Sequence, residues 1–100
     1  MPRREISKIM FFYNYVLQSL IQENEPYVGY TTDLKERMEK HNQGLVKSTK
    51  AYRPWKLIYY EACLNEEDAK RRERYLKTTQ GQRLLKRRLK EYFYHNKYNK

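Results

Sequence analysis

Gly29 stands inside a stretch that otherwise has the composition of a β-strand, with tyrosines on both sides of it. Glycine weakens the interior of a strand, because it has no side chain to pack, and it is used there where another group must approach the backbone closely. We therefore expect residues 27–31 to form a strand that leaves space over Gly29. A sheet containing this strand is the first constraint on the fold.

Two further segments are typical of strands. Residues 11–21 are rich in aromatic and aliphatic side chains, and the polar residues 22–25 interrupt them before Pro26. This pattern predicts a hairpin with residues 27–31. Residues 55–64 have apolar side chains at both odd and even positions, which predicts a third strand covered on both faces.

Capping residues predict a helix directly after the second strand. Thr32 or Asp33 can cap it, Asp33 and Glu36 have the spacing of a capping box, and the helical pattern continues to Gly44. The basic, polar segment that follows, residues 44–54, is predicted to be a loop.

Two more helices are predicted in the carboxyl-terminal half. Asn65 and the three acidic residues after it are typical of a helix start, and this helix runs to about Thr79. Beyond Gly81, apolar residues recur at helical spacing along a last, strongly basic helix: Leu85, Leu89 and Tyr92 or Phe93. The predicted fold is α+β, a small three-stranded antiparallel sheet flanked by helices in the order β-β-α-β-α-α.

Positive charge is concentrated near the carboxyl terminus. The net charge is +10, and residues 69–100 hold twelve basic side chains and two acids, Glu73 and Glu91, which accounts for all of it. A solvated helix face is one explanation, but the density favours a polyanionic partner. Two groups are expected to contact phosphates: a loop cluster, Lys47, Lys50 and Arg53, and a helix cluster, Arg83, Lys86, Arg87, Arg88 and Lys90.

Length and cysteine content limit the other possibilities. One hundred residues make a single domain with a small core. The lone Cys63 excludes an internal disulfide and a multi-cysteine zinc site, and suits a reducing cytoplasm. The first residues imitate a signal peptide, yet Asn14 and Gln18 interrupt the apolar stretch, which is too short to cross a bilayer. We expect a cytoplasmic protein without a membrane partner.

Candidate site residues lie on two of the predicted helices. Arg37 and His41 are four residues apart and share a face just beyond the strand that bears Tyr27. A cation and an imidazole near a phenol can bind a phosphate. Glu73 lies on the inward stripe of the next helix, where a carboxylate needs a partner.

Each candidate also has an ordinary structural interpretation. Glu73 could pair with Lys77, Arg37 with a surface glutamate, and His41 could be a cation at a helix end, while the tyrosines could simply pack within the sheet. No single residue distinguishes these interpretations from a functional one.

The combination and its spacing resemble a known family. Tyr15, in "YNYVLQSL", is followed after eleven intervening positions by Tyr27, in "YVG"; Arg37 and His41 come ten and fourteen residues later, and "RRERYLK" follows. The sequence resembles the GIY-YIG nuclease superfamily, especially its small stand-alone bacterial branch, and is similar to the N-terminal nuclease domain of the bacterial excinuclease.

The resemblance covers residues 11–90 of the single domain 1–100, so that residues 1–10 and 91–100 are extensions. It implies a role for each matching residue: Tyr15 or Tyr27 activates or positions the attacking water, Gly29 leaves room for phosphate and water, Arg37 binds the scissile phosphate, His41 assists proton movement, and Glu73 holds one divalent ion, Mg²⁺ or Mn²⁺. One carboxylate with water and substrate phosphate is a common way to hold Mg²⁺.

The first motif departs from the family pattern. It reads Tyr13-Asn14-Tyr15 where the family name has Gly-Ile-Tyr, and the polar Asn14 is unexpected in a strand. Many members also have a downstream asparagine near the site, but Asn96 and Asn99 lie in the tail beyond the matched region.

Two functions follow from the sequence. The first is a metal-dependent endonuclease that hydrolyses phosphodiester bonds of DNA, in preference to RNA, during repair or recombination. The alternative is a non-catalytic DNA- or RNA-binding module that keeps the fold. Both bind a polyanion, but only the first requires Glu73, Arg37 and the tyrosines to act as one unit.

Overall fold

A computed structural model describes residues 9–23 and 26–98, with side chains described to residue 95. Three antiparallel strands form one sheet in the order β2-β1-β3. The strands are β1 (Phe12–Ser19), β2 (Tyr27–Thr31) and β3 (Trp55–Cys63). Most of the predicted extension at residues 1–10, the turn residues Asn24 and Glu25, and Asn99 lie outside the described residues.

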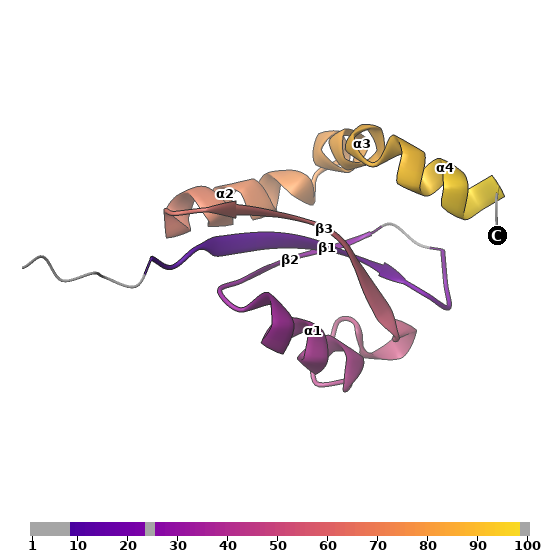
Figure 1. The fold of residues 1–100 in the computed structure, drawn as a ribbon, viewed down its shortest axis with the longest axis horizontal. Coiled ribbons are helices and arrows are strands. Elements are labelled where there is room, and N and C mark those ends of the chain that lie inside the picture. Colours follow the sequence, from indigo (N-terminus) through magenta and orange to yellow (C-terminus); the bar gives the residue numbers. More distant parts are fainter. Residues whose placement is uncertain (1–8, 24–25, 99–100) are drawn as a thin grey trace, which may run out of the picture.

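Helices cover both faces of the sheet (Figure 1). Helix α1 (Leu34–Asn42) and the short 3₁₀ helix η1 (Lys50–Tyr52) lie below it, and α2 (Glu66–Leu76) lies above it. Helices α3 (Thr79–Arg88) and α4 (Lys90–Tyr98) continue from α2 on the same side. The predicted α+β class and the order β-β-α-β-α-α are confirmed, with the last predicted helix divided into two.

Strand β1 lies at the centre of the sheet and directs alternate side chains to opposite faces. Tyr15 and Leu17 pack with Trp55 on the α1 side, whereas Val16 packs with Leu76 on the α2 side. The two small cores are therefore separated by the thickness of one sheet.

A β-bulge interrupts the pairing of β1 with β3. Val16 is opposite Tyr59 and Leu17 is opposite Leu57, which leaves Ile58 as the extra residue. Ile58 and Tyr59 consequently both pack toward the α2 core, while Leu57 packs toward α1. The expected cover on both faces of the third strand is thus present, although its side chains do not alternate simply.

Helix caps explain where α1 and α2 begin. The Asp33 carboxylate accepts a hydrogen bond from the Glu36 backbone N–H at 3.0 Å, and Asn65 caps α2 in the same way through Asp68. The predicted capping box is only half formed, because the Asp33 backbone N–H donates to Thr31 instead of to the side chain of Glu36. Both helices also end earlier than predicted, at Asn42 and Leu76.

Gly81 was expected before the last helix, but it lies within the first turn of α3, where the Thr78 side chain caps the helix. A Cβ at Gly81 would lie 2.1 Å from the Tyr75 carbonyl oxygen and 2.5 Å from the Leu76 Cα. The glycine therefore allows α3 to pack tightly against the end of α2, and a glycine used for close packing looks the same in a sequence as one that ends a helix.

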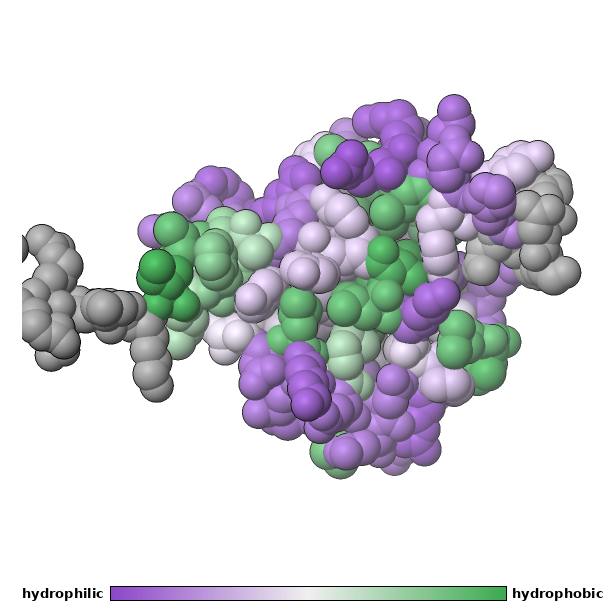
Figure 2. Space-filling view, in the orientation of Figure 1, coloured by the Kyte–Doolittle hydropathy of each residue, from purple (hydrophilic) through white to green (hydrophobic). Residues whose placement is uncertain are grey.

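Hydrophilic side chains cover α2 and α3 along the top and α1 along the bottom, with hydrophobic surface between them (Figure 2). None of the helices in the described part of the chain combines the length and the apolar composition that a membrane span requires.

Candidate active site

Tyr15 is at the centre of a hydrogen-bonded cluster on the α1 side of the sheet. Its hydroxyl lies 2.8 Å from His41 Nε2, and Arg37 Nε donates to the same oxygen at 3.2 Å. Both partners project from α1 one turn apart, as the four-residue spacing predicted. The side chains of Tyr15 and His41 are fully buried, whereas Arg37 is half-buried.

The second ring nitrogen of His41 fixes the direction of these bonds. His41 Nδ1 lies 2.7 Å from Thr49 Oγ1, and that hydroxyl donates to the Val46 carbonyl oxygen. Thr49 therefore accepts from Nδ1–H, which leaves Nε2 as the acceptor of the Tyr15 hydroxyl. The resulting chain runs from Tyr15 through His41 and Thr49 to the backbone.

Burial determines the protonation states of the side chains in this hydrogen-bonded series. Desolvation, with a contribution from the Arg37 charge, lowers the pKa of His41 to about 4, so its imidazole is neutral at pH 7. Burial also raises the pKa of Tyr15, although the Arg37 hydrogen bond partly opposes this. His41 is therefore not the helix-end cation of the structural interpretation, and its Nε2 acts as the hydrogen-bond acceptor of Tyr15.

Gly29 is paired with Tyr15 across β1 and β2, and the phenol of Tyr15 lies over it. A Cβ at position 29 would lie 2.2 Å from both Cζ and the hydroxyl oxygen of Tyr15. The close approach expected at this glycine is thus made by the tyrosine. The expectation that phosphate and water use this space needs correction, because the phenol fills it.

Tyr27 completes an aromatic group around His41. Its ring lies 5.4 Å from the His41 ring and 6.4 Å from the Tyr15 ring. Tyr27 is half-buried, and its hydroxyl accepts an exposed hydrogen bond from Ser48 at 3.4 Å. Of the two motif tyrosines, Tyr27 is the one that solvent reaches.

Glu73 lies on α2, across the sheet from this cluster. Its carboxylate pairs with Lys77 at 3.3 Å, the partner that the structural interpretation named. Burial is the main cause of the raised pKa of Tyr15, and the Glu73 charge adds a small contribution in the same direction. Lys77 and Tyr27 also line one cavity of about 300 Å³ at the β2 edge of the sheet, so the end of α2 and the tyrosine border the same space.

Among the described residues, no carboxylate lies within ion-pair distance of Arg37. The pairing of Arg37 with a surface glutamate, considered from the sequence, is therefore not found there. The described side chains also form no group of three or more His, Cys, Asp or Glu that could hold a metal. A metal in this part of the chain would therefore depend on few protein ligands.

The basic residues predicted to bind phosphate lie on both sides of the sheet. The loop cluster is part of the segment that carries Thr49, beside α1, and its three side chains are exposed. The helix cluster lies on α3 and at the start of α4, on the α2 side, and is also exposed. Within it, Arg88 lies beside Tyr59, where burial raises the pKa of the phenol and the Arg88 charge partly opposes this.

Thr49 and Asn42 are site residues that the sequence did not reveal. Thr49 is fully buried, orients His41, and accepts the indole N–H of Trp55 through its carbonyl oxygen at 2.8 Å. The Asn42 amide makes two hydrogen bonds to the backbone of Trp55. A threonine inside a basic loop and an asparagine at a helix end carry no sequence signal for these contacts.

Comparison with known proteins identifies the family of this chain. A family model described as the GIY-YIG catalytic domain matches residues 11–87. The chain belongs to the GIY-YIG family. Its relatives include UPF0213 proteins of Pediococcus pentosaceus, 48% identical over 65% of this chain and 67% of the relative, and of Staphylococcus haemolyticus, 39% identical over 73% and 90%. No solved structure matches the chain significantly.

A UPF0213 protein of Clostridium perfringens is also similar, at 37% identity over 71% of this chain and 78% of the relative. The small stand-alone branch predicted from the sequence is thus confirmed. Membership of the GIY-YIG family implies a nuclease-type function and a nucleic-acid partner. The names of the relatives specify no substrate.

Proposed function

We propose that this GIY-YIG domain is a metal-dependent endonuclease that hydrolyses phosphodiester bonds of DNA. The observation that carries the proposal is the chain Arg37–Tyr15–His41, which joins a cation, a phenol and a neutral imidazole beside the more exposed Tyr27. These are the groups that phosphodiester hydrolysis needs, since negative charge develops on the phosphoryl oxygens and a proton must leave the attacking water.

Arg37 binds the scissile phosphate in this proposal. Its Nε donates to Tyr15, which fixes the plane of the guanidinium. The terminal N–H groups make no hydrogen bond to the described residues and can form a charge-assisted pair with phosphate oxygens. Tyr15 therefore orients the arginine as well as packing in the sheet.

Tyr15 and Tyr27 have different roles in this proposal because they differ in burial. The Tyr15 hydroxyl is fully buried and its pKa is raised, so it keeps its proton at neutral pH and positions Arg37 and His41. The ring of Tyr27 lies against the same imidazole, and its hydroxyl is accessible, so this hydroxyl contacts the attacking water. His41 accepts the hydrogen bond of the Tyr15 hydroxyl through Nε2, and in this proposal it assists proton movement through that bond.

Glu73 fits a divalent cation as a single carboxylate ligand. Its side chain is 23% exposed, and its present partner Lys77 is 52% exposed and can move away. Mg²⁺ commonly keeps several waters and binds through one or two carboxylates plus substrate phosphate, so the lack of a larger acidic cluster is no obstacle. Such an ion, Mg²⁺ or Mn²⁺, would stabilise charge on the phosphoryl group.

The second candidate is a non-catalytic nucleic-acid-binding module. The ion pair between Glu73 and Lys77 favours it, because a carboxylate that only pairs with a neighbouring lysine has a structural role. Under either function we propose a cytoplasmic protein, in keeping with the lone Cys63, that prefers DNA to RNA; for the enzyme we propose a role in repair or recombination.

The deciding experiment is incubation of the full chain with labelled DNA and RNA, as duplex, branched and single-stranded forms, with Mg²⁺ or Mn²⁺. Glu73→Gln should reduce cleavage by at least about two orders of magnitude, as the loss of a major transition-state contact does. Its affinity for DNA in EDTA should stay equal or rise slightly, because a negative charge has been removed.

Glu91→Gln is the matched control. Glu91 is the other acid among residues 69–100, is exposed on α4, and gives the same change of net charge. It should cleave like the wild type. Equal cleavage by the wild type, Glu73→Gln and Arg37→Ala would identify a contaminating nuclease and leave the binding module as the function.

A further inference from the structure

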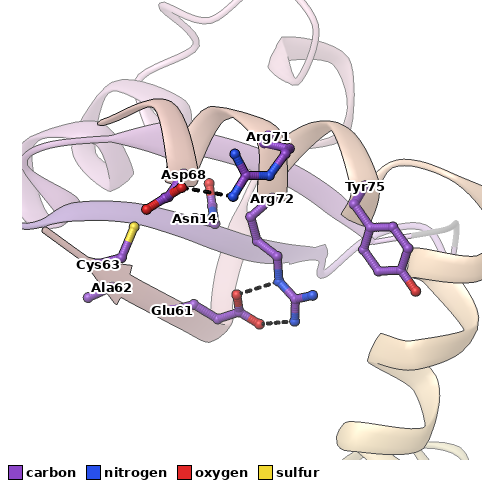
Figure 3. Close-up of a pocket in the computed structure, with 8 residues that line it drawn as sticks. All are labelled: Asn14, Glu61, Ala62, Cys63, Asp68, Arg71, Arg72 and Tyr75. Carbon is purple, nitrogen blue, oxygen red and sulfur yellow. Dashed lines mark hydrogen bonds and ion pairs between the residues drawn. The ribbon is translucent and has the colours of Figure 1, made fainter. Parts of the chain in front are cut away.

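Asn14 lies on the floor of a cavity that is separate from the cluster around Tyr15. The cavity has a volume of about 510 Å³ and lies between α2 and β3, on the opposite face of the sheet (Figure 3). Its lining includes Asn14 of β1, Glu61 of β3, and Asp68, Arg71, Arg72 and Tyr75 of α2. Because the side chains of adjacent strand residues point to opposite faces of a sheet, Tyr15 and Asn14 lie on different faces.

The Asn14 amide has a hydrogen-bonding capacity that the protein does not use. Asn14 is only 3% exposed, and its Oδ1 has no hydrogen-bond partner among the described residues. A buried carbonyl oxygen without a partner destabilises a fold, so such groups are rare and usually have a reason. An apolar side chain at this central strand position would avoid that cost, which indicates that the amide oxygen has a ligand.

The other lining residues define the kind of ligand. Arg72 forms a two-pronged ion pair with Glu61 at 2.8 and 2.9 Å, and Arg71 pairs with Asp68 at 2.8 Å. Two cations and two anions cancel, so this cavity does not select a phosphate. It favours a neutral group that donates hydrogen bonds to Asn14 and to the carboxylates at the rim.

Flat surfaces are also available. The guanidinium of Arg72 lies 5.5 Å from the centre of the Tyr75 ring, and that ring is partly exposed at one end of the cavity. Unpaired bases are commonly bound by stacking on aromatic rings or guanidinium planes, with their edges hydrogen-bonded to polar side chains. A cavity of this volume is within the range of small-molecule sites.

We propose that this cavity binds one unpaired nucleobase bearing an exocyclic amino group, with the amine donating to Asn14 Oδ1 and the ring stacking at Arg72 and Tyr75. Asparagine pairs with adenine in this manner through its amide oxygen and nitrogen. The inference rests on the proposed nucleic-acid substrate and assigns it a second contact, away from the scissile phosphate. With this contact the domain recognises unpaired bases as well as the phosphate backbone of the nucleic acid.

The test uses nucleosides, which have no phosphate, and EDTA, so that it needs neither cleavage nor a metal. Adenosine is titrated into the full chain and followed by the side-chain amide resonances of Asn14 in ¹⁵N NMR spectra. Purine riboside, which has the same ring without the amine, is the matched probe. Adenosine should shift the Asn14 amide and bind at least about fivefold more tightly than purine riboside.

Three variants separate the base contact from folding defects and from phosphate contacts. Asn14→Leu has a similar shape and should abolish the preference for adenosine. Tyr75→Leu removes a partly exposed aromatic ring and should lower the affinity for adenosine several-fold. The Asn14 amide should still respond to adenosine in this variant. Lys47→Ala, tested with single-stranded oligonucleotides, should lower the affinity for adenine and thymine sequences equally, as a phosphate contact does.

The outcomes are distinct for the two proposals. Equal binding of adenosine and purine riboside, or an Asn14 amide that does not respond, would overturn the base site and leave the carbonyl oxygen as a buried acceptor without a ligand. An adenosine preference that persists in Asn14→Leu would overturn it too. Absence of DNA cleavage by the wild type would count against the nuclease without affecting these titrations.

Discussion

Gly29→Ala should disable the site through Tyr15, although a methyl group is a small addition and alanine is tolerated in strands. The new Cβ would lie 2.2 Å from Cζ and the hydroxyl oxygen of Tyr15 and 2.7 Å from Cε1. The phenol cannot simply rotate away, because it is packed against Tyr27 and His41 and is fully buried. It must leave the position in which it contacts His41 and Arg37.

The magnitude follows from the contacts that are lost. Overpacking a well-packed core costs about 1–3 kcal/mol, and each buried hydrogen bond of Tyr15 contributes about 0.5–1.5 kcal/mol. The substitution should therefore reduce the free energy of unfolding by about 2–6 kcal/mol. With a urea dependence of about 1.5 kcal/mol per molar, a loss of about 3 kcal/mol lowers the midpoint by about 2 M.

The assay is urea unfolding followed by the fluorescence of Trp55, the single tryptophan, whose ring lies 6.1 Å from that of Tyr27. Tyr15→Leu removes all three atoms that the new methyl group would meet. In that background Gly29→Ala should cost at least about 1 kcal/mol less, as expected for coupled neighbours.

Gly44→Ala is the control for a glycine outside this contact. Gly44 has a φ of +79°, so alanine there is strained, but the nearest atoms belong to the flexible Arg53 guanidinium. It should destabilise the fold by about 1 kcal/mol and show no coupling to Tyr15→Leu. If Gly29→Ala costs the same with and without the tyrosine ring, the reasoning about this pair is refuted.

Three further predictions concern charge and packing. The pKa of His41 is lowered to about 4 in the folded state from its usual 6.5, so between these values the unfolded chain binds more protons. Stability should therefore fall by up to about 3 kcal/mol as the pH drops from 6.5 to 4, and His41→Gln should remove most of this slope in urea titrations across that range. Neutralising the loop cluster should reduce the log–log salt dependence of DNA binding by about 0.9 per phosphate contact; an unchanged slope would place the phosphates elsewhere. Gly81→Ala, which presses a methyl group against the backbone of α2, should cost about 3 kcal/mol in thermal or urea unfolding, and a neutral result would contradict the close packing of α3.

The sheet and the beginnings of the helices could be predicted because they depend on local patterns. Residues 27–31 are a strand as expected, and Asp33 and Asn65 cap their helices. The ends of helices were less accessible. The break at Leu89 between α3 and α4 and the place of Gly81 inside α3 depend on how the helices pack, which no short sequence pattern records.

The candidate site, like the fold, could be predicted only in part from the sequence. The four-residue spacing of Arg37 and His41 predicted a shared face, and both residues contact Tyr15. The phenol over Gly29 was not foreseen, because the pairing of position 15 with position 29 is a matter of strand register. Thr49 was missed for a similar reason: it reaches His41 from a loop whose path is fixed by tertiary contacts with Asn42 and Trp55.

The alternation along β1 has a consequence for errors in folding. Asn14 and Tyr15 are neighbours in the sequence, yet one lines the cavity under α2 and the other anchors the cluster beside α1. A slip of one residue in the pairing of β1 would exchange the two faces. The phenol would then be under α2 and the amide over Gly29, so a mispaired molecule would lose both surfaces together and could not persist as a half-functional form.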